Sequence, residues 1–275
     1  MRISVFDIGG TWIKHAQFDG ASLSETIYIP TEAHRGTSQM IDKLTEILRE
    51  EMDASPLDAV GISTRGQVDP SDGSILFDPP DVFPDYTGTN LPQLIRQALN
   101  APELAVAVEN DANCAALAES FFGASRQFND CLMLTFGTGI GGGIILDGKI
   151  YHGDRFSSGE FGMMYLPDEC GRPKYWEQLA SPKVLEKNPD LWLQRISMGI
   201  ASLIHIFNPP CVVLGGGQME GLQRCASVCQ AVYPLLAPGF EHLTITGAEL
   251  GNRAGMLGAG YLAMQRIKEK GCEMR

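Results

Sequence analysis

Two segments of this 275-residue chain combine glycines with an acidic or hydroxyl side chain. They are Asp7-Ile-Gly-Gly-Thr11 and Gly137-Thr-Gly-Ile-Gly-Gly142. Glycines allow positive φ and leave backbone N–H groups bare, so such turns can hold anions, phosphate above all. Asp7 could also hold Mg²⁺, directly or through water, because hard cations prefer oxygen ligands. The alternative for both segments is a plain turn without a ligand.

Both segments belong to a pattern that occurs twice. Residues 7–20 and 135–148 each contain a Gly/Thr-rich turn, an apolar run and a closing Asp-Gly, at an offset of 128 residues (135 minus 7). Each copy follows another apolar run, so each predicts strand, tight turn, strand and hairpin. Gly-x-Gly-x-x-Gly in the second copy matches a dinucleotide fingerprint, which has to open a helix. The residues that follow it, 143–146, predict a strand, so we favour a duplicated fold with phosphate-binding turns.

A third candidate lies where an apolar strand ends and an Ala-rich helix begins. Asp111 at this junction could act as a general base and accept a proton from an attacking hydroxyl. Aspartate is also a preferred helix N-cap, and the two roles compete for the same oxygens. Asn110 or Asn113 could cap the helix instead. The sequence leaves these alternatives open.

Weaker candidates occur in the second half of the chain. Gly215-Gly216-Gly217 follows a strand and could pack against a nucleotide or form a tight turn. Glu160 and Glu177 lie in a stretch, residues 152–182, that predicts irregular structure. Carboxylates near a cleft suit sugar hydroxyls, which donate well to charged acceptors. The alternative is solvated loop charge.

Composition excludes several classes of protein. The net charge of −12 argues against nucleic-acid binding, which favours basic surfaces. No apolar run is long enough to cross a bilayer, and no signal peptide is evident, so we expect a cytoplasmic protein. Seven cysteines without a Cys-x-x-Cys pair are read as reduced thiols. Strands followed by alternating helices and strands, twice, predict mixed sheets covered by helices.

Seven segments in this order resemble the ROK sugar kinases of the sugar-kinase, Hsp70 and actin superfamily. The resemblance implies an α/β, duplicated ribonuclease-H-like (actin-like ATPase) fold, with two domains of mixed sheets flanked by helices around a central cleft. The implied domains are residues 1–112 plus about 252–275, and residues 113–251. The segments are Asp7–Thr11, Ser63–Asp69, Glu109–Ala116, Gly137–Gly143, Ser158–Gly162, Trp176–Ser181 and Val212–Gly217.

The resemblance also implies a reaction. An ATP-dependent sugar kinase would transfer the γ-phosphoryl of ATP to a hexose hydroxyl, usually the 6-hydroxyl, with Asp111 as general base and Mg²⁺ held by Asp7. The substrate would be glucose, a β-glucoside or an N-acetylmannosamine-like sugar. The implied nucleotide and Mg²⁺ contacts are Asp7, Gly9, Gly10, Thr11, Lys14, Gly137, Thr138, Gly139, Gly215 and Gly216. The implied sugar contacts are Gly66, Asn90, Asn110, Glu160 and Glu177.

One segment departs from the family. Most members carry a histidine and a cysteine-rich zinc loop where this chain has Met163 and only Cys170. A thioether and one thiol cannot form a four-ligand structural zinc site, so we expect no zinc. The resemblance further implies a homodimer. A non-catalytic sugar or nucleotide sensor on the same fold is the alternative function, although the base Asp111 is retained.

Overall fold

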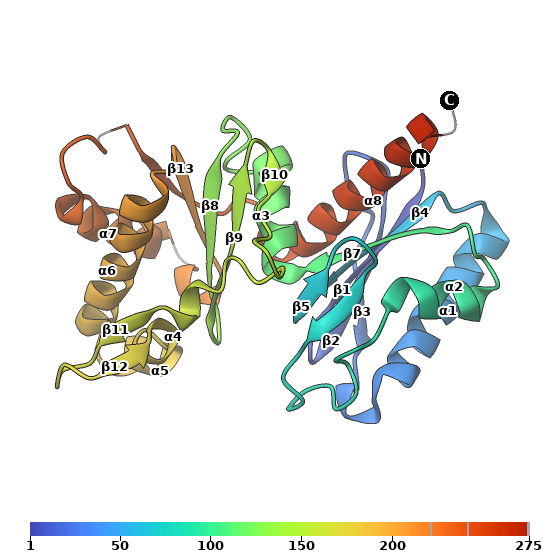
Figure 1. Ribbon diagram of the computed structural model, residues 1–275, viewed down its shortest axis with the longest axis horizontal. Coiled ribbons are helices and arrows are strands. Elements are labelled where there is room, and N and C mark those ends of the chain that lie inside the picture. Colours follow the sequence, from blue (N-terminus) through green and yellow to red (C-terminus); the bar gives the residue numbers. More distant parts are fainter. Residues whose placement is uncertain (221, 241, 274–275) are drawn as a thin grey trace. The chain divides into compact units, whose positions relative to one another are not determined.

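The computed structural model describes residues 1–220, 222–240 and 242–273, and it divides into two compact units (Figure 1). Unit 1 comprises Met1–Ala118, Asp154–Phe156 and Asn252–Arg275, and unit 2 comprises Glu119–Gly153 and Ser157–Gly251. The predicted domain boundary, between residues 112 and 113, lies in the same helix as the boundary between the two units, which falls after Ala118. The assignment of these units as functional domains stays a proposal. Residues 274 and 275 of the predicted first domain lie outside the described part.

Unit 1 is built on a five-stranded mixed sheet of order β3-β2-β1-β4-β7. The first three strands are antiparallel neighbours, whereas β4 and β7 run parallel to β1. The elements are β1 (Ile3–Ile8), β2 (Trp12–Phe18), β3 (Ile27–Pro30), η1 (Ala33–Arg35), α1 (Thr37–Ala54), β4 (Ala59–Thr64), β5 (Gln67–Asp69), β6 (Ser74–Phe77), α2 (Leu91–Leu99), β7 (Ala105–Asn110) and α8 (Ala254–Glu273). Helix α3 (Asp111–Phe122) continues from unit 1 into unit 2.

Unit 2 repeats this design with the sheet order β10-β9-β8-β13-β14. Strands β13 and β14 are again parallel to β8, and β9 and β10 are antiparallel. The elements are β8 (Cys131–Phe136), β9 (Ile140–Leu146), β10 (Lys149–Ile150), η2 (Phe161–Met163), β11 (Tyr165–Pro167), β12 (Pro173–Tyr175), α4 (Trp176–Leu179), α5 (Pro182–Lys187), α6 (Pro189–Phe207), β13 (Cys211–Gly215), η3 (Gly217–Met219), α7 (Leu222–Val232), η4 (Tyr233–Leu235), β14 (Thr244–Gly247) and η5 (Gly251–Arg253).

The two sheets confirm the predicted duplication. Strands β1 and β2 correspond to β8 and β9 with the same offset of 128 residues at all four strand ends. The predicted Asp-Gly hairpin is tight in unit 2, where Asp147 and Gly148 both have positive φ and join β9 directly to β10. In unit 1 the corresponding turn leads to a longer connection, because β3 begins only at Ile27.

Helices cover both faces of the unit 1 sheet. Side chains of α1 and α2 pack with Val60 and Ile62 of β4 in one buried cluster. Successive strand residues point to opposite faces, so Gly61 faces the other side, where α8 lies. A Cβ on Gly61 would come 2.3 Å from the carbonyl oxygen of Ala259. The missing side chain therefore lets the backbone of α8 contact the sheet.

The prediction that residues 152–182 are irregular is wrong in part. Strands β11 and β12 pair there in an antiparallel ribbon, and α4 and η2 flank it. The Asp168 carboxylate closes the ribbon by accepting the backbone N–H groups of Cys170 and Arg172. The rings of Tyr165 and Tyr175 lie 4.8 Å apart across it. Residues 69–90, which are rich in Asp, Pro and Gly, likewise contain a strand, β6. No helix within the described ranges is long and apolar enough to span a membrane.

Replacing Gly61 with alanine tests the close contact of α8. The added methyl group overlaps backbone that cannot rotate away, and overpacking of this kind costs about 1–3 kcal/mol. We expect Gly61→Ala to unfold at lower urea concentration than the wild type. Gly217→Ala is the matched control, because no atom lies within 4 Å of its added Cβ. Equal unfolding midpoints for the two variants would contradict the contact.

Candidate active site

Asp7 lies near the end of β1 and is held on both sides. Its Oδ2 is 2.8 Å from Nζ of Lys14, the residue opposite it on β2. Its Oδ1 accepts a hydrogen bond of 2.7 Å from the Ser63 hydroxyl of β4. Gly255 of α8 leaves room for this cluster, since a Cβ there would lie 3.0 Å from Oδ1. The structure therefore brings predicted contacts Asp7 and Lys14 together and adds Ser63, which the sequence did not indicate.

The predicted phosphate turn connects β1 to β2. The Gly9 N–H donates to the Trp12 carbonyl at 3.0 Å, which closes a four-residue turn. Thr31 fixes the turn from outside, because its hydroxyl donates to the Gly9 carbonyl at 2.7 Å and its N–H to the Thr11 carbonyl at 3.0 Å. Gly10 and Thr11 are exposed. The turn is thus a solvent-facing loop that hydrogen bonds hold in place.

Asn110 resolves the competition at the start of α3. Its Oδ1 accepts the N–H groups of Ala112 and Asn113, at 2.9 and 3.2 Å, so Asn110 caps the helix. Its Nδ2 donates to the carbonyl of Gly66 at 3.0 Å. Asp111 is the exposed first residue of α3, and its Oδ1 also accepts the Ala112 N–H at 2.8 Å. The capping role falls mainly to Asn110, which leaves the Asp111 side chain at the surface of the helix N-terminus.

Three carboxylates converge on the buried thiol of Cys114. Burial raises the pKa of Cys114 well above its ordinary value, and the charges of Glu109, Asp7 and Asp111 raise it further. The strand register also places Asp7 beside Ser63 and Ser63 beside Glu109, at the same end of the unit 1 sheet, and Asp111 follows Glu109 by two residues. Asp7 and Asp111, which the resemblance places in one catalytic site, therefore lie in one neighbourhood of unit 1. Glu109 was not predicted as a functional residue; it is buried and accepts the Asn113 side-chain amide at 3.0 Å.

Arg65 is a further residue that sequence reasoning missed. Its guanidinium is 2.6 Å from Oδ1 of Asp78, whose side chain is buried. Burial raises the pKa of Asp78, although the hydrogen bond from Arg65 opposes the rise. The same guanidinium lies about 4.0 Å from the position of a Cβ on Gly10. A cation is therefore held beside the predicted phosphate turn and next to Gly66, where φ is +89°.

In unit 2 the two predicted glycine turns lie together. Gly137 donates to the Gly139 carbonyl at 2.9 Å, and Thr138 between them is exposed. A Cβ on Gly216 would come within 2.6 Å of the Phe136 backbone, so the second turn abuts the first. Gln218 joins them, because its Nε2 donates to the Gly137 carbonyl at 2.6 Å. Gly142 of the same motif has a different surrounding: it is buried in β9, where a Cβ would lie 2.5 Å from the Phe161 ring.

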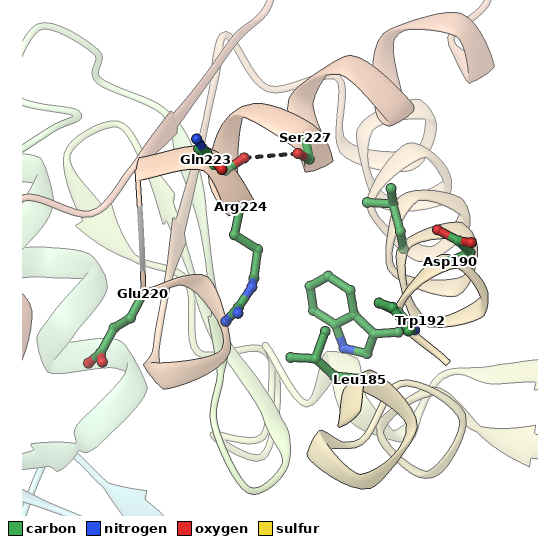
Figure 2. A pocket seen from close by; sticks show the side chains of 9 residues that line it. Leu185, Asp190, Trp192, Glu220, Gln223, Arg224 and Ser227 are labelled. Atoms are coloured by element: carbon green, nitrogen blue, oxygen red, sulfur yellow. Dashed lines mark hydrogen bonds between the residues drawn. The ribbon is translucent and has the colours of Figure 1, made fainter. Parts of the chain in front are cut away.

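A cavity of about 510 Å³ in unit 2 is lined by residues of α5, α6 and α7 (Figure 2). Trp192 of α6 and Leu185 of α5 form apolar walls, and Arg224 of α7 extends toward the same space. Both Trp192 and Arg224 reach Gln218: the indole N–H donates to its Oε1 at 2.7 Å, and Arg224 donates to its carbonyl at 2.8 Å. The cavity combines an apolar wall with polar groups, as small-molecule sites do.

The predicted acidic pair also lies beside the first turn. The Glu177 Oε2 would be 2.7 Å from a Cβ on Gly139 and 2.9 Å from one on Gly162. Partial desolvation raises the pKa of Glu160, and the negative charge of Glu177 raises it further. The two carboxylates are therefore neighbours, as expected of side chains that share a polar ligand.

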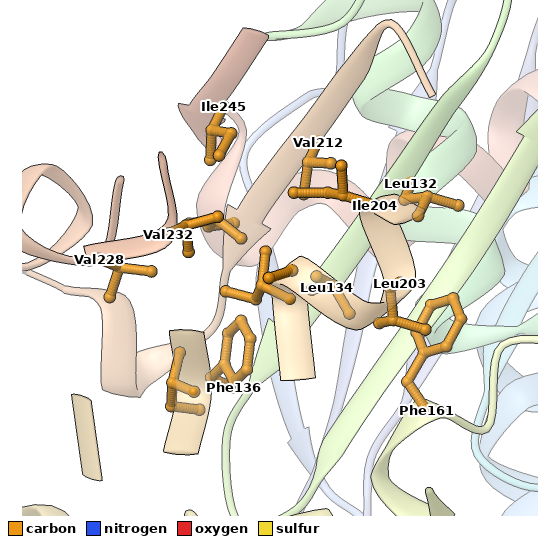
Figure 3. Packing of buried hydrophobic residues seen from close by; sticks show 14 of the residues in the cluster. Leu132, Leu134, Phe136, Phe161, Leu203, Ile204, Val212, Val228, Val232 and Ile245 are labelled. Carbon is orange, nitrogen blue, oxygen red and sulfur yellow. The ribbon is translucent and has the colours of Figure 1, made fainter. Parts of the chain in front are cut away.

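Aromatic side chains anchor the residues next to these groups. Phe136 precedes Gly137 and Trp176 precedes Glu177, and their rings pack edge to face with centroids 5.9 Å apart. Phe161 follows Glu160 and packs against Phe207 of α6. Figure 3 shows Phe136 and Phe161 within the unit 2 core, among β8, β13 and α6. The polar residues of unit 2 thus extend from a rigid apolar layer.

Asn90 lies apart from the other predicted sugar contacts of unit 1, and Met163, at the position of the family histidine, is exposed. Asn90 caps α2 by accepting the Gln93 N–H at 2.8 Å, and its amide donates to Ser74 at 3.0 Å. The described contacts do not bring Asn90 to Gly66 or Asn110. Met163 ends η2 with 54% of its surface exposed. Over the described ranges, no group of three or more His, Cys, Asp or Glu residues is arranged to hold a metal. The expected absence of zinc stays a prediction.

The acidic pair leads to a pH-dependent prediction. The pKa of Glu160 is raised in the folded protein, so ionising this carboxyl costs stability at neutral pH. We expect Glu160→Gln to be more stable than the wild type at pH 7. The difference should shrink as the pH falls through the pKa of Glu160, because the wild-type carboxyl then becomes neutral. Urea unfolding from pH 4 to 8 measures it. Glu186→Gln, at an exposed position on α5, is the control; an equal pH dependence in both variants would contradict the prediction.

Comparisons with known proteins agree with this geometry. The ROK family model matches residues 3–198 and 190–266. An uncharacterized protein of Clostridium perfringens is 33% identical over 94% of this chain and 96% of its own length. A beta-glucoside kinase of Listeria monocytogenes is 29% identical over 96% of this chain and 98% of its own. The crystal structure of a ROK family glucokinase from Streptomyces griseus in complex with glucose and AMPPNP has a TM-score of 0.79 and 25% identity, and the match covers 96% of this chain and 100% of that one. The resemblance seen in the sequence is confirmed, and the chain belongs to the ROK family.

Proposed function

We propose that this protein is an ATP-dependent sugar kinase that transfers the γ-phosphoryl of ATP to a hydroxyl of a hexose or hexose derivative. The observation that carries the proposal is the position of Asp111 at the start of α3, beside an Asn110 that caps the helix and holds Gly66. Family membership supports it, since a similar Listeria protein is a beta-glucoside kinase and a similar Streptomyces protein is a glucokinase.

The proposed donor site in unit 2 uses backbone and apolar groups. The turn Gly137–Gly139 would bind phosphate oxygens through the exposed Thr138, by its hydroxyl and N–H, and through the Gly139 N–H. The 510 Å³ cavity next to Gln218 would take the base and ribose, with Trp192 and Leu185 as apolar walls. Gly216 lies against the backbone of Phe136, and Gln218 bonds both Gly137 of the turn and Trp192 of the cavity lining. A bound nucleotide would therefore span groups that the structure holds in one rigid frame.

Asp7 fits the proposed role at Mg²⁺ through a water molecule. Both carboxylate oxygens already accept hydrogen bonds, from Lys14 and Ser63, and the group keeps lone pairs that a metal-bound water can use. Mg²⁺ bound with ATP neutralises charge on the phosphates. Lys14, Arg65 and the N–H groups of Gly10 and Thr11 would add positive potential around the same turn.

Asp111 would accept the proton of the attacking sugar hydroxyl. An exposed carboxylate at a helix N-terminus can receive a proton from a hydroxyl within hydrogen-bond reach. In unit 1, Gly66 and Asn110 would contact the sugar, and in unit 2, Glu160 and Glu177 would accept its hydroxyl protons. Asn90 is the weakest of the predicted sugar contacts, because both ends of its amide bond other residues.

The finer parts of the proposal concern substrate and assembly. We propose the 6-hydroxyl as acceptor, with glucose, a β-glucoside or an N-acetylmannosamine-like sugar as substrate. We further propose a cytoplasmic homodimer that binds no nucleic acid, in keeping with the net charge of −12. The sensor alternative gains no support, because it predicts loss of the base and the chain retains Asp111.

A panel of sugars tests the proposed function. ADP release from Mg²⁺-ATP is measured with glucose, cellobiose and other β-glucosides, N-acetylmannosamine, N-acetylglucosamine, mannose, fructose and allose. We expect at least one sugar to raise turnover far above the ATP-only rate. NMR of the product then identifies the phosphorylated hydroxyl. A flat panel together with intact ATP binding would contradict the kinase and support the sensor.

A further inference from the structure

A second cavity, of about 320 Å³, lies in unit 1 at the free edge of the sheet. Its apolar lining comes from β7, the last strand in the sheet order, through Val106 and Val108. The loop 70–73 between β5 and β6, helix α2 and helix α8 supply the rest. Its volume lies at the lower end of the range for small-molecule sites.

Two arginines line this cavity, and both donate to backbone carbonyls. Arg96 of α2 donates through Nε to the Leu104 carbonyl at 2.9 Å. Arg266 of α8 donates to the carbonyls of Pro70 and Ser71. Neither guanidinium forms an ion pair within the described residues, although the chain has 33 acidic residues against 21 basic ones. The backbone bonds fix each side chain and leave further N–H donors for another acceptor.

Besides the two arginines, the cavity lining has hydroxyl and amide side chains and one carboxylate. Ser71 and Gln93 can bond hydroxyl groups, whereas the amide of Asn90 already bonds Ser74 and the Gln93 N–H at the start of α2. Asp72 is the only carboxylate among the lining residues, and it accepts the Ser74 N–H at 2.8 Å within its own turn. Two guanidinium charges against one carboxylate give the cavity a positive excess in an acidic protein.

We infer that this cavity binds a small phosphate ester that carries hydroxyl groups. Guanidinium groups pair with phosphate oxygens in charge-assisted hydrogen bonds, and the apolar floor from β7 strengthens such bonds. The Gln93 amide and the Ser71 hydroxyl would bind the hydroxyl groups of the ester. The inference does not depend on the proposed kinase activity, because Arg96 and Arg266 belong to no part of the candidate active site.

The test measures binding without ATP, Mg²⁺ or turnover. Isothermal titration calorimetry uses glucose 6-phosphate and inorganic phosphate as probes, with the wild type, Arg96→Gln and Arg266→Gln. We expect each substitution to weaken glucose 6-phosphate binding about tenfold, the usual effect of losing a charge-assisted pair. Arg49→Gln is the matched control, because the exposed Arg49 also donates to a backbone carbonyl, that of Ala98, outside the cavity. Its affinity should stay at the wild-type value.

Chemical modification of the wild type avoids any dependence on variant folding. Phenylglyoxal labelling followed by mass spectrometry should show that glucose 6-phosphate protects Arg96 and Arg266 but not Arg49. Equal binding by all variants, or unchanged labelling, would place the ligand elsewhere and overturn the site. Equal affinity for the two probes would overturn the ester in favour of free phosphate. A protein inactive on the whole sugar panel can still pass this test, so failure of the proposed function and failure of this inference are separate results.

Discussion

The carboxamide of Asn110 is the interaction on which the candidate site of unit 1 depends. Its oxygen caps α3 and its nitrogen holds the Gly66 carbonyl, so one side chain connects the end of β7, the start of α3 and the loop after β4. An N-cap of this kind is worth about 1 kcal/mol to a helix. Its larger effect is geometric, because it decides which residue begins the helix and therefore where Asp111 stands. The same bond presents the Gly66 backbone beside it.

In unit 2 the polar groups are positioned by glycines, which let neighbouring backbone segments pack closely, rather than by one side-chain amide. Gly142, Gly162 and Gly216 each lie where a Cβ would meet another backbone or ring at 2.6 Å or less. These contacts press the loop that carries Glu160 against β9 and the second turn against the first. Buried Phe136, Phe161 and Trp176 then hold the neighbours of Gly137, Glu160 and Glu177 in the core. A rigid frame of this kind costs little reorganisation when a ligand binds.

Much of this arrangement could be predicted from the sequence, because it depends on local pattern. Alternating apolar runs and the Asp-Gly turns placed β1, β2, β8 and β9, and the glycines marked the turns between them. Other features depend on partners distant in the chain. No local signal pairs Arg65 with Asp78 or Gln218 with Gly137. The ribbon β11–β12 has too few apolar residues to give a strand pattern, and Asp168 closes it by a turn that the sequence alone does not distinguish from loop. Asn90 illustrates a local signal that points to a different role. The resemblance assigns it to the sugar, but its position before Leu91-Pro92 is also that of a helix N-cap, and the structure shows it capping α2.

The proposed function depends on Asp111 as the general base, and the variant Asp111→Asn tests this role most directly. The change keeps the size of the side chain and removes its basicity. With a sugar that the wild type phosphorylates, we predict that kcat falls at least about 10²-fold, while the dissociation constant for a non-hydrolysable ATP analogue stays unchanged. Asp42→Asn, the same chemical change at an exposed position of α1, should leave kcat at the wild-type value. A kcat for Asp111→Asn within a few-fold of the Asp42→Asn control would contradict the assignment of Asp111 as the general base.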